Sequence, residues 1–391
     1  MIMMRAEVFG GRNMIYFDYT ADTPPDNRVL KEYIRAAQIF ANPNSAHSAG
    51  WEAKNEIDGS ISLMAELLHI KPSEIIMTSG ASEANNLAVK GLTFTDRRRG
   101  KHIVSTFLEH SSVSGALTFL QEQGWEIDIV NVKPDGMIDI DHLRTLLRED
   151  TVLCAVCAVD SELGTVQPIG QIAEILKDYP NCRFHVDATQ AIGKIKLDLT
   201  QADTASFAPH KFYGLKGSGI LYKREEIVLE PMIHGGASTT IYRSGTPDTA
   251  AIAAAAKALE LTENEFEKRL AYVTNINRIL RDEIRSIQGL IINSPENAVP
   301  HILNVSSTGI KGSKMQEMLN EKGICISVKS ACSVPNTPSR PVMAITHDRK
   351  RALSSWRISL SHLTTEQDIE ALTKALREIM EHEVKKMMRS R

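Results

Sequence analysis

The chain has 391 residues, 42% of them hydrophobic, with a formal net charge of −3. This length exceeds what one hydrophobic core usually supports, so we expect a large domain and a smaller one. The balanced charge argues against electrostatic binding of nucleic acid, and no apolar run reaches the roughly 18 residues of a membrane span. The N-terminus lacks the pattern of a signal peptide, and the five cysteines fit reduced thiols. We therefore expect a cytoplasmic protein.

Two hydrophobic patterns alternate along the first part of the chain. Apolar runs typical of buried strands cover residues 74–77, 102–106, 126–130, 152–159, 183–186 and 219–222. Helical patterns lie between them, at residues 85–92, 112–123 and 169–178. This alternation predicts an α/β fold with a mostly parallel mixed sheet flanked by helices.

The pattern changes after Gly245. Residues 249–259 and 263–286 read as two long helices, residues 301–305 and 324–328 as short strands, and a closing helix begins at Glu366. We expect a large domain of residues 15–260 and a small α+β domain of residues 261–391. Their boundary should fall within 255–270, and residues 1–40 are candidates to pack with the small domain.

Lys211 is the most informative single residue, because Asp187 ends a buried strand about two dozen residues before it. Pyridoxal phosphate (PLP) needs an amine that forms a Schiff base and an acid that keeps its pyridine nitrogen protonated. Taken alone, each residue is more often a surface lysine or a helix-capping aspartate. The combination predicts a PLP site.

Two further segments support this interpretation. Residues 78–86 follow a strand and open a helix, so small residues there, Ala81 and Ser82 among them, expose backbone N–H groups to an anion such as phosphate. His110 follows the next strand, where an imidazole could stack on a cofactor ring or transfer protons.

The remaining cysteine pattern does not predict a metal or redox site. Cys154 and Cys157 form a C-x-x-C, but they lie inside an apolar run in which positions three apart face opposite sides of a strand. Cys325 also lies in an apolar run and reads as a small buried hydrophobe. Cys332, by contrast, lies in a polar, loop-like segment that suits a reactive thiol.

These residues resemble the cysteine desulfurases of the nitrogen-fixation and iron–sulfur-cluster type, within the class V aminotransferase group of fold-type I PLP enzymes. The resemblance runs from about Tyr16 to Leu376. It is carried by residues 41–47 (ANPNSAH), 78–86, 109–110 (EH), 162–168 (ELGTVQP), 186–190 (VDATQ), 210–211 (HK), 242–247 (YRSGTP), 329–332 (KSAC) and 356–360 (WRISL).

The resemblance implies a role for each matching residue. Lys211 would hold PLP, Asp187 would pair with the ring nitrogen, Gln190 would hydrogen-bond the ring hydroxyl, and His110 would stack on the ring. Ser82 and His210 would bind the phosphate, joined by Thr246 of the partner subunit, which implies a homodimer with shared active sites. Arg357 would clamp the carboxylate of L-cysteine.

Cys332 is the residue that turns such an enzyme into a desulfurase. The resemblance implies that its thiolate takes the sulfur of the substrate, keeps it as a persulfide for a sulfur-acceptor protein, and releases alanine. The identity of that acceptor does not follow from the chain.

Several positions depart from the family, and they surround the cofactor. Tyr19 and Asp22 stand in a segment that normally borders the substrate, Ser161 replaces an amide beside the ring hydroxyl, and Ala208 replaces a phosphate-binding serine. These changes leave two alternatives open. One is a lyase or aminotransferase acting on another amino acid, and the other is a non-catalytic paralogue that serves as an adaptor.

Overall fold

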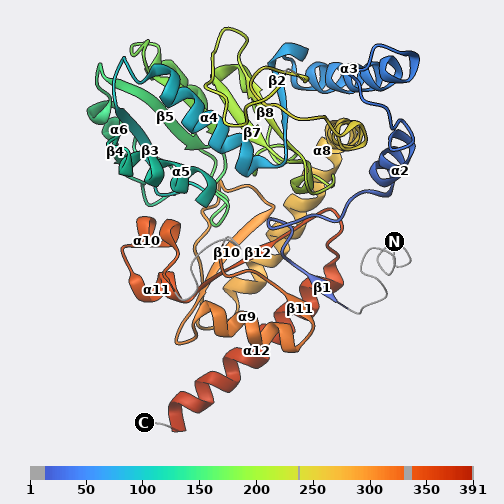
Figure 1. The fold of residues 1–391 in the computed structure, drawn as a ribbon. Helices are drawn as coiled ribbons and strands as arrows, with labels where there is room; N and C mark the ends of the chain where they lie inside the picture. The colour runs from blue at the N-terminus through green and yellow to red at the C-terminus, as the bar shows by residue number, and fades with distance from the viewer. Residues whose placement is uncertain (1–13, 237, 330–336, 390–391) are drawn as a thin grey trace.

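The computed structural model describes residues 14–236, 238–329 and 337–389. Its upper part in Figure 1 is built on a seven-stranded sheet of order β2-β8-β7-β6-β5-β3-β4, in which only β8 runs against the others. The strands are β2 (Ile75–Thr78), β3 (His102–Thr106), β4 (Glu126–Val130), β5 (Thr151–Cys157), β6 (Arg183–Asp187), β7 (Thr204–Phe207) and β8 (Gly219–Lys223).

Helices cover both faces of this sheet because successive residues of the buried strands point to opposite sides. Ile103 and Leu153 pack with α4 (Ala81–Asp96) and α5 (Ser111–Glu122). Val104 and Cys154 belong to a second core on the other face. The helices that contribute to this second core are α3 (Ser48–Leu68), α6 (Ile140–Leu146), α7 (Ile169–Leu176) and the first part of α8 (Thr249–Arg285).

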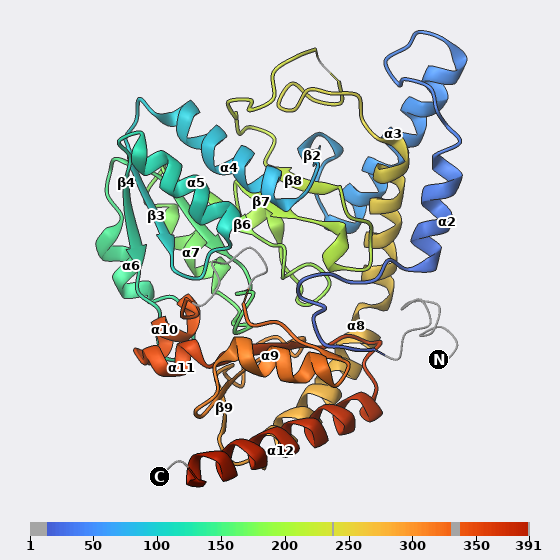
Figure 2. The same cartoon turned by 60° about the horizontal axis from the view of Figure 1, so that its bottom comes forward.

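The lower part of Figure 1 has a core of its own. An antiparallel sheet of order β12-β10-β9 lies beside the parallel pair β1-β11. These strands are β1 (Ile15–Tyr16), β9 (Leu290–Ile292), β10 (Ile302–Ser307), β11 (Ile324–Cys325) and β12 (Ser355–Ser359). They pack with the second half of α8, α9 (Gly312–Glu321) and α12 (Glu366–Arg389), whose arrangement is clearest in Figure 2.

Three short helices complete the described structure. Helix α2 (Asn27–Ala36) packs against α8, as α3 does. Helices α10 (Arg340–Thr346) and α11 (Arg349–Leu353) lie between the two sheets at one side of the molecule.

The predicted α/β fold with its mostly parallel mixed sheet is confirmed. The six predicted strands of the large sheet are present within about two residues at each end. The prediction of two helices at 249–259 and 263–286 was wrong, because α8 is continuous from Thr249 to Arg285. Residues 249–285 contain no glycine or proline, which would favour a break in the helix. The helix therefore continues from the core of the upper sheet into the core of the lower sheet. The strand predicted at 324–328 is limited to Ile324 and Cys325.

The division into residues 15–260 and 261–391 stays a prediction, and its boundary region lies within α8. Residues at the start of the described chain do contact the lower sheet, since β1 pairs with β11 and Phe17 is part of the lower core.

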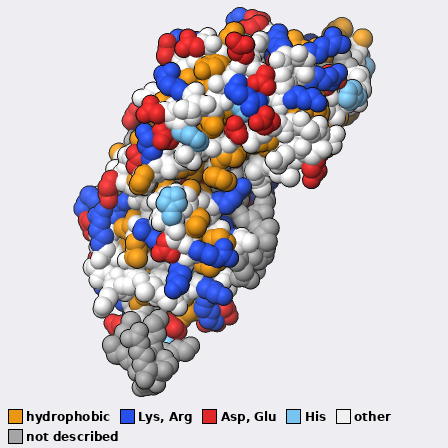
Figure 3. Space-filling view, turned by 90° about the vertical axis from the view of Figure 1, so that its left-hand side faces the viewer, with side chains coloured by type: hydrophobic (Ala, Val, Ile, Leu, Met, Phe, Trp, Pro, Cys, Tyr) orange, Lys and Arg blue, Asp and Glu red, His pale blue; other side chains and the backbone are white. Residues whose placement is uncertain are grey.

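Among the described residues, no helix has both the length and the hydrophobicity to cross a membrane. On the face seen in Figure 3, cationic and anionic side chains are interspersed, with hydrophobic side chains between them.

Candidate active site

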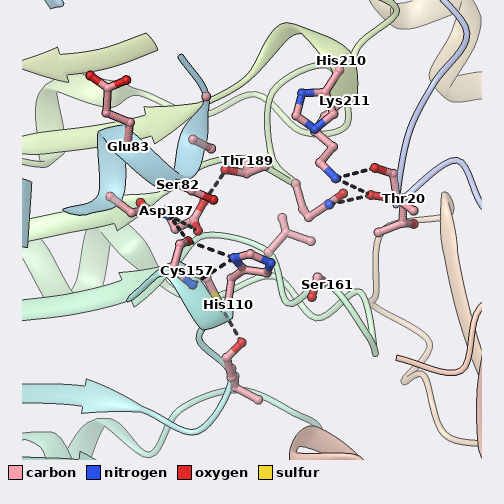
Figure 4. A pocket seen from close by; sticks show the side chains of 18 of the residues that line it. Thr20, Ser82, Glu83, His110, Cys157, Ser161, Asp187, Thr189, His210 and Lys211 are labelled. Carbon is pink, nitrogen blue, oxygen red and sulfur yellow. Dashed lines mark hydrogen bonds between the residues drawn. The ribbon is translucent and has the colours of Figure 1, made fainter. Parts of the chain in front are cut away.

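A pocket of about 390 Å³ lies at the carboxyl ends of β5, β6 and β7, where α/β folds commonly bind ligands. The start of α4 and the strand β12 close it from two sides (Figure 4). Its walls are formed by Thr20, Ala21, Ser79, Gly80, Ala81, Ser82, Glu83, Asn85, Leu108, His110, Ser112, Cys157, Val159, Ser161, Asp187, Thr189, Gln190, His210, Lys211 and Arg357.

Asp187 lies at the floor of the pocket because it is the last residue of β6. Its Oδ1 accepts a hydrogen bond from the Thr189 backbone N–H at 2.9 Å, and its Oδ2 accepts one from Asn85 Nδ2 at 2.9 Å. The carboxylate is 5% exposed, so these donors stabilise its charge in a buried position. Each oxygen keeps a lone pair for a further donor.

Asn85 connects Asp187 to the rest of the floor. Its Nδ2 also donates to Ser112 Oγ at 2.8 Å, while its Oδ1 pairs with His185 Nε2 at 2.9 Å and accepts from Ser206 Oγ. Burial lowers the pKa of His185 to about 4, so this imidazole is neutral at pH 7. All four hydrogen-bonding positions of the Asn85 amide are therefore occupied, which fixes the orientation of Asp187.

His110 forms the adjacent wall, at the N-cap of α5. Its Nδ1 accepts from the backbone N–H of Ser112 at 3.2 Å and lies 2.9 Å from Ser112 Oγ. Burial lowers the pKa of His110, and the nearby charge of Lys211 acts in the same direction. The ring is thus a neutral imidazole with its Nδ1 occupied and Nε2 left for a ligand.

Lys211 enters the pocket from the short helix Pro209–Lys211, which follows β7. Its Nζ donates to the carbonyl oxygens of Thr20 at 3.0 Å and Ala21 at 2.7 Å (Figure 4). Burial, followed by the guanidinium of Arg357, lowers the pKa of Lys211 to about 8. An amine with a lowered pKa is more easily deprotonated, as a nucleophilic lysine requires.

The segment predicted to bind phosphate, residues 78–86, forms a cradle at the N-terminus of α4. This helix starts at Ala81, and Gly80 before it provides no side-chain cap. Backbone N–H groups at this end are therefore open to an anion. Strand β8 passes directly behind it, since a Cβ at Gly219 would stand 2.3 Å from the carbonyl carbon of Gly80. A glycine at position 219 thus permits the close approach of β8 to the cradle.

Glu83 lies one residue beyond Ser82 and accepts from the Ser79 N–H at 2.7 Å and from Arg243 Nε at 2.9 Å. Burial alone would raise the pKa of Glu83, but these two donors outweigh it and lower the pKa. The carboxylate is therefore charged and already paired at neutral pH.

Arg357 reaches the pocket from β12 in the lower sheet, and its side chain is 2% exposed. One terminal nitrogen donates to the Ser161 carbonyl at 2.7 Å and the other to Asp18 Oδ1 at 2.9 Å, whereas Nε has no partner among the described residues. The guanidinium is thus held in place with one buried N–H still available.

Two contacts tie the segment after residue 336 to this site. Ser339 Oγ donates to the buried Glu162 Oε2 at 2.6 Å, and Arg340 donates to the Glu109 carbonyl at 2.9 Å. On the other side of the gap, Lys329 Nζ donates to the carbonyl and hydroxyl of Thr337. The two ends of the segment that carries Cys332 therefore lie together beside the pocket, while Cys332 itself lies outside the described residues.

The structure brings most of the predicted site residues into this one pocket. They are Ala81, Ser82, His110, Ser161, Asp187, Gln190, His210, Lys211 and Arg357. Thr246 is exposed and is not among the lining residues of this pocket. Tyr19 and Asp22 do not line it either: Tyr19 is buried edge-on against Tyr16, and Asp22 pairs with Lys216.

Sequence reasoning missed Asn85, Ser112, Thr189 and Thr20 as site residues. Asn85 lies inside the predicted cradle segment, but its side chain points to Asp187 rather than to the cradle. Cys157 was expected to be a core residue, and its thiol is buried with its pKa raised by burial, yet it also lines the pocket. A pattern of apolar residues cannot distinguish a strand end beside a cavity from one in the core.

The residues present fit PLP. A hydrogen-bonded carboxylate, an amine of lowered pKa and an open helix N-terminus match the ring nitrogen, the aldehyde and the phosphate of that cofactor. Two buried acceptors of the pocket, Thr189 Oγ1 and Gln190 Oε1, have no partner within the described chain. A polar ligand with hydroxyl and pyridine groups would satisfy them.

Comparisons with known proteins identify the family of the chain. Residues 15–372 match the family model described as Aminotransferase class-V, and the chain belongs to that family. It is 36% identical over 367 residues to a protein named Cysteine desulfurase IscS from Pseudoalteromonas translucida, covering 91% of this chain and 90% of that one. It is also 36% identical to a NifS/IcsS protein homolog from Lactobacillus delbrueckii subsp. bulgaricus, covering 94% and 98%.

Solved structures give the same result. A structure titled NIFS-LIKE PROTEIN superposes with a TM-score of 0.89 at 34% identity and covers 94% of this chain and 100% of that one. Another, titled SspA in complex with cysteine, has a TM-score of 0.79 at 32% identity, with 90% and 100% covered. The fold is therefore that of the NifS-like proteins, as the resemblance implied.

Proposed function

We propose that this protein is a PLP-dependent cysteine desulfurase, which converts L-cysteine to L-alanine and collects the sulfur as a persulfide on Cys332. One observation carries the proposal: Lys211, Asp187 and Arg357 come from separate parts of the fold and line a single pocket. The names of relatives that align over nearly the whole chain support the same reaction.

The described residues could hold both the pyridine ring and the phosphate of PLP. Asp187 would face the pyridine nitrogen, His110 would lie against the ring, and Ser82 with the α4 N–H groups would hold the phosphate. Gln190 and Ser161 would serve the ring hydroxyl. His210 would stand beside the phosphate as a neutral donor, since burial and then Lys211 lower the pKa of His210 to about 4.

When bound through an amine, PLP withdraws electrons from the α-carbon of an amino acid. The residues of the chain would control where protons go. Lys211 would be the amine that holds the cofactor, and its amine could also serve as a base for proton transfer in the pocket. Its lowered pKa places it near the working pH, at which a base is most effective.

Arg357 would orient the substrate by its carboxylate. Its planar guanidinium matches a carboxylate, and its Nε, which has no partner within the described chain, is a donor that such a group could engage. Asp18 and the Ser161 carbonyl would keep the guanidinium at that position before substrate arrives.

Cys332 would receive the sulfur. A thiolate at this position would attack the sulfur of bound cysteine, so that an S–S bond forms, the C–S bond of the substrate breaks, and the carbon takes a proton to give alanine. Ser339 and Lys329, which flank the segment of Cys332, are both hydrogen-bonded within the described chain.

The proposal also covers the oligomeric state of the protein, its sulfur acceptor and its location in the cell. We infer a homodimer in which Thr246 of the partner subunit completes the phosphate site, a sulfur-acceptor protein as the second substrate, and a cytoplasmic location. Thr246 is exposed in the single chain, which leaves it free to reach a neighbouring pocket.

The test is alanine production from L-cysteine by the PLP-loaded protein in the presence of a thiol reductant. We expect alanine and sulfide in equal amounts from the wild type, and neither from Lys211→Ala. Cys332→Ala should also lose activity while keeping the visible absorption of bound PLP. If Cys332→Ala forms products at the wild-type rate, the persulfide route is wrong, and a lyase acting without it replaces the proposal.

A further inference from the structure

A second, much smaller cavity lies directly behind Lys211. It has a volume of about 20 Å³, which suits one group the size of a water molecule. Lys211 separates it from the cofactor pocket, because this residue lines both. The opposite walls come from Lys194, which follows β6, and from His301 and His362, which flank strands of the lower sheet.

Four of the polar groups that line this cavity have no partner within the described chain. Lys194 Nζ, His301 Nδ1, His362 Nδ1 and Thr20 Oγ1 are all buried without a hydrogen bond. Lys194 and His301 are each only 7% exposed. Leaving one such donor unsatisfied costs about 1–3 kcal/mol, and more if it is charged, so the cavity is built for something that accepts hydrogen bonds.

The charged side chains that line the cavity are all cationic. Lys194, Lys211 and Arg269 line it, and no carboxylate does. Asp26 and Glu265, whose fields reach His362, are already hydrogen-bonded to arginines. Of the carboxylates that act on Lys211 from the other side, Asp18 pairs with Arg357 and Asp22 with Lys216, while Asp187 is hydrogen-bonded by neutral donors at the floor of the cofactor pocket.

We propose that this cavity binds one monovalent anion of about the size of chloride, held by Lys194 Nζ and His301 Nδ1. The anion would supply the counter-charge that Lys194 lacks and would accept hydrogen bonds from donors that have no other partner. The small volume excludes phosphate, sulfate and carboxylates.

The site would act on Lys211 through its charge. Burial, and then the charges of Lys211 and Arg357, lower the pKa of Lys194 to about 7. A bound anion would favour the ammonium form of Lys194 and would offset part of the positive field that lowers the pKa of Lys211. Occupancy of this cavity would thereby adjust the protonation of the amine that holds the cofactor.

The direct experiment uses crystals of the PLP-loaded protein grown without halide and soaked in bromide. We expect an anomalous peak between Lys194 Nζ and His301 Nδ1 in the wild type, and no peak in Lys194→Met. Lys196→Met is the matched control, because that lysine is two residues away, exposed and paired with Glu267. The control should keep the peak.

A solution measurement covers the case in which Lys194→Met does not fold. In gluconate buffer, bromide should raise the unfolding temperature of the wild type saturably, by about 1–2 °C at bromide concentrations about tenfold above the dissociation constant. His301→Asn should weaken this response, and the larger iodide should produce less of it.

Three results would overturn the proposal. One is a wild-type cavity that holds water alone after the bromide soak. Another is a peak that persists unchanged in Lys194→Met, which would mean an adventitious ion only. The third is a rise in unfolding temperature that is the same for all halides and for both lysine variants, because that would reflect general salt effects rather than a site.

Discussion

The two sides of the cofactor pocket are built in different ways. At the floor of the pocket, the side chains are held by hydrogen bonds within the chain: Asn85 makes four, and Asp187 and His110 each make two. On the side of Arg357 and Gln190, buried atoms remain without partners in the described chain.

The difference separates two tasks. The floor orients the groups that would face the cofactor ring, so little reorganisation is needed when the ring is bound. The side of Arg357 and Gln190 keeps hydrogen-bonding capacity for ligands that come and go. Mutations on the two sides should therefore differ in kind, with the first affecting chemistry or folding and the second affecting substrate binding.

The largest effect is expected from Asp187→Asn at the floor of the pocket. The amide removes the negative charge opposite the ring nitrogen, so the rate of alanine formation should fall by about a hundredfold or more. Asp198→Asn is the control, because Asp198 caps a short surface helix. Equal rates for wild type and Asp187→Asn would show that Asp187 does not serve the ring nitrogen.

Arg357→Lys should act on substrate binding instead. A lysine cannot reproduce the planar pair of N–H groups, so KM for cysteine should rise about tenfold to a hundredfold with a smaller change in kcat. Arg349→Lys, at an exposed position of α11, should leave both constants unchanged. A loss confined to kcat would contradict the role of Arg357 as the carboxylate clamp.

Asn85→Ala should weaken the fold. It leaves Asp187, His185 and Ser206 short of partners in a buried place, so the free energy of unfolding in urea should fall by about 2–3 kcal/mol. Asn86→Ala is the matched neighbour, since Asn86 bonds only to backbone carbonyls near the surface, and it should cost less than about 1 kcal/mol. Equal losses of unfolding free energy in both variants would show that the hydrogen bonds of Asn85 contribute no more to stability than those of Asn86.

A smaller effect concerns pH. Burial raises the pKa of Glu109 to about 8, so the folded protein keeps a proton that the unfolded chain releases above its ordinary pKa near 4.5. This contribution to stability is complete at acid pH and is lost as pH rises toward 8.

Glu109→Gln cannot titrate, so its free energy of unfolding should fall less steeply than that of the wild type between pH 5 and 8. Some slope should remain, because burial also raises the pKa of Asp160 to about 7. Urea unfolding at several pH values measures both slopes. Parallel curves would show that Glu109 is ionised in the folded protein.

Much of this arrangement could be predicted from the chain. The strand ends carry Asp187 and, one turn beyond β7, Lys211, and the alternation of patterns places such ends at one edge of a parallel sheet. Local patterns could not give the Asn85 network, because its members are about 20 to 120 residues apart and meet only through the strand order.

The wrong predictions have a similar origin. The continuity of α8 depends on which surfaces it contacts along its length, and a change of buried face looks like an interruption in the sequence. Tyr19 stands in a segment that was expected to border the substrate. Its neighbours Thr20 and Ala21 do line the pocket, whereas Tyr19 lies in a turn and packs edge-on against Tyr16.

The most direct test of the account compares two thiols: that of Cys157, which lines the pocket, and that of Cys332, which would accept the sulfur. Burial raises the pKa of Cys157 well above its ordinary value, so we expect it to stay an inert thiol. The measurement is a single turnover of L-cysteine followed by peptide mass spectrometry. The account predicts one added sulfur atom on the peptide of Cys332, and none on that of Cys157. Extra sulfur on Cys157, or alanine formed with no added sulfur on either peptide, would contradict it.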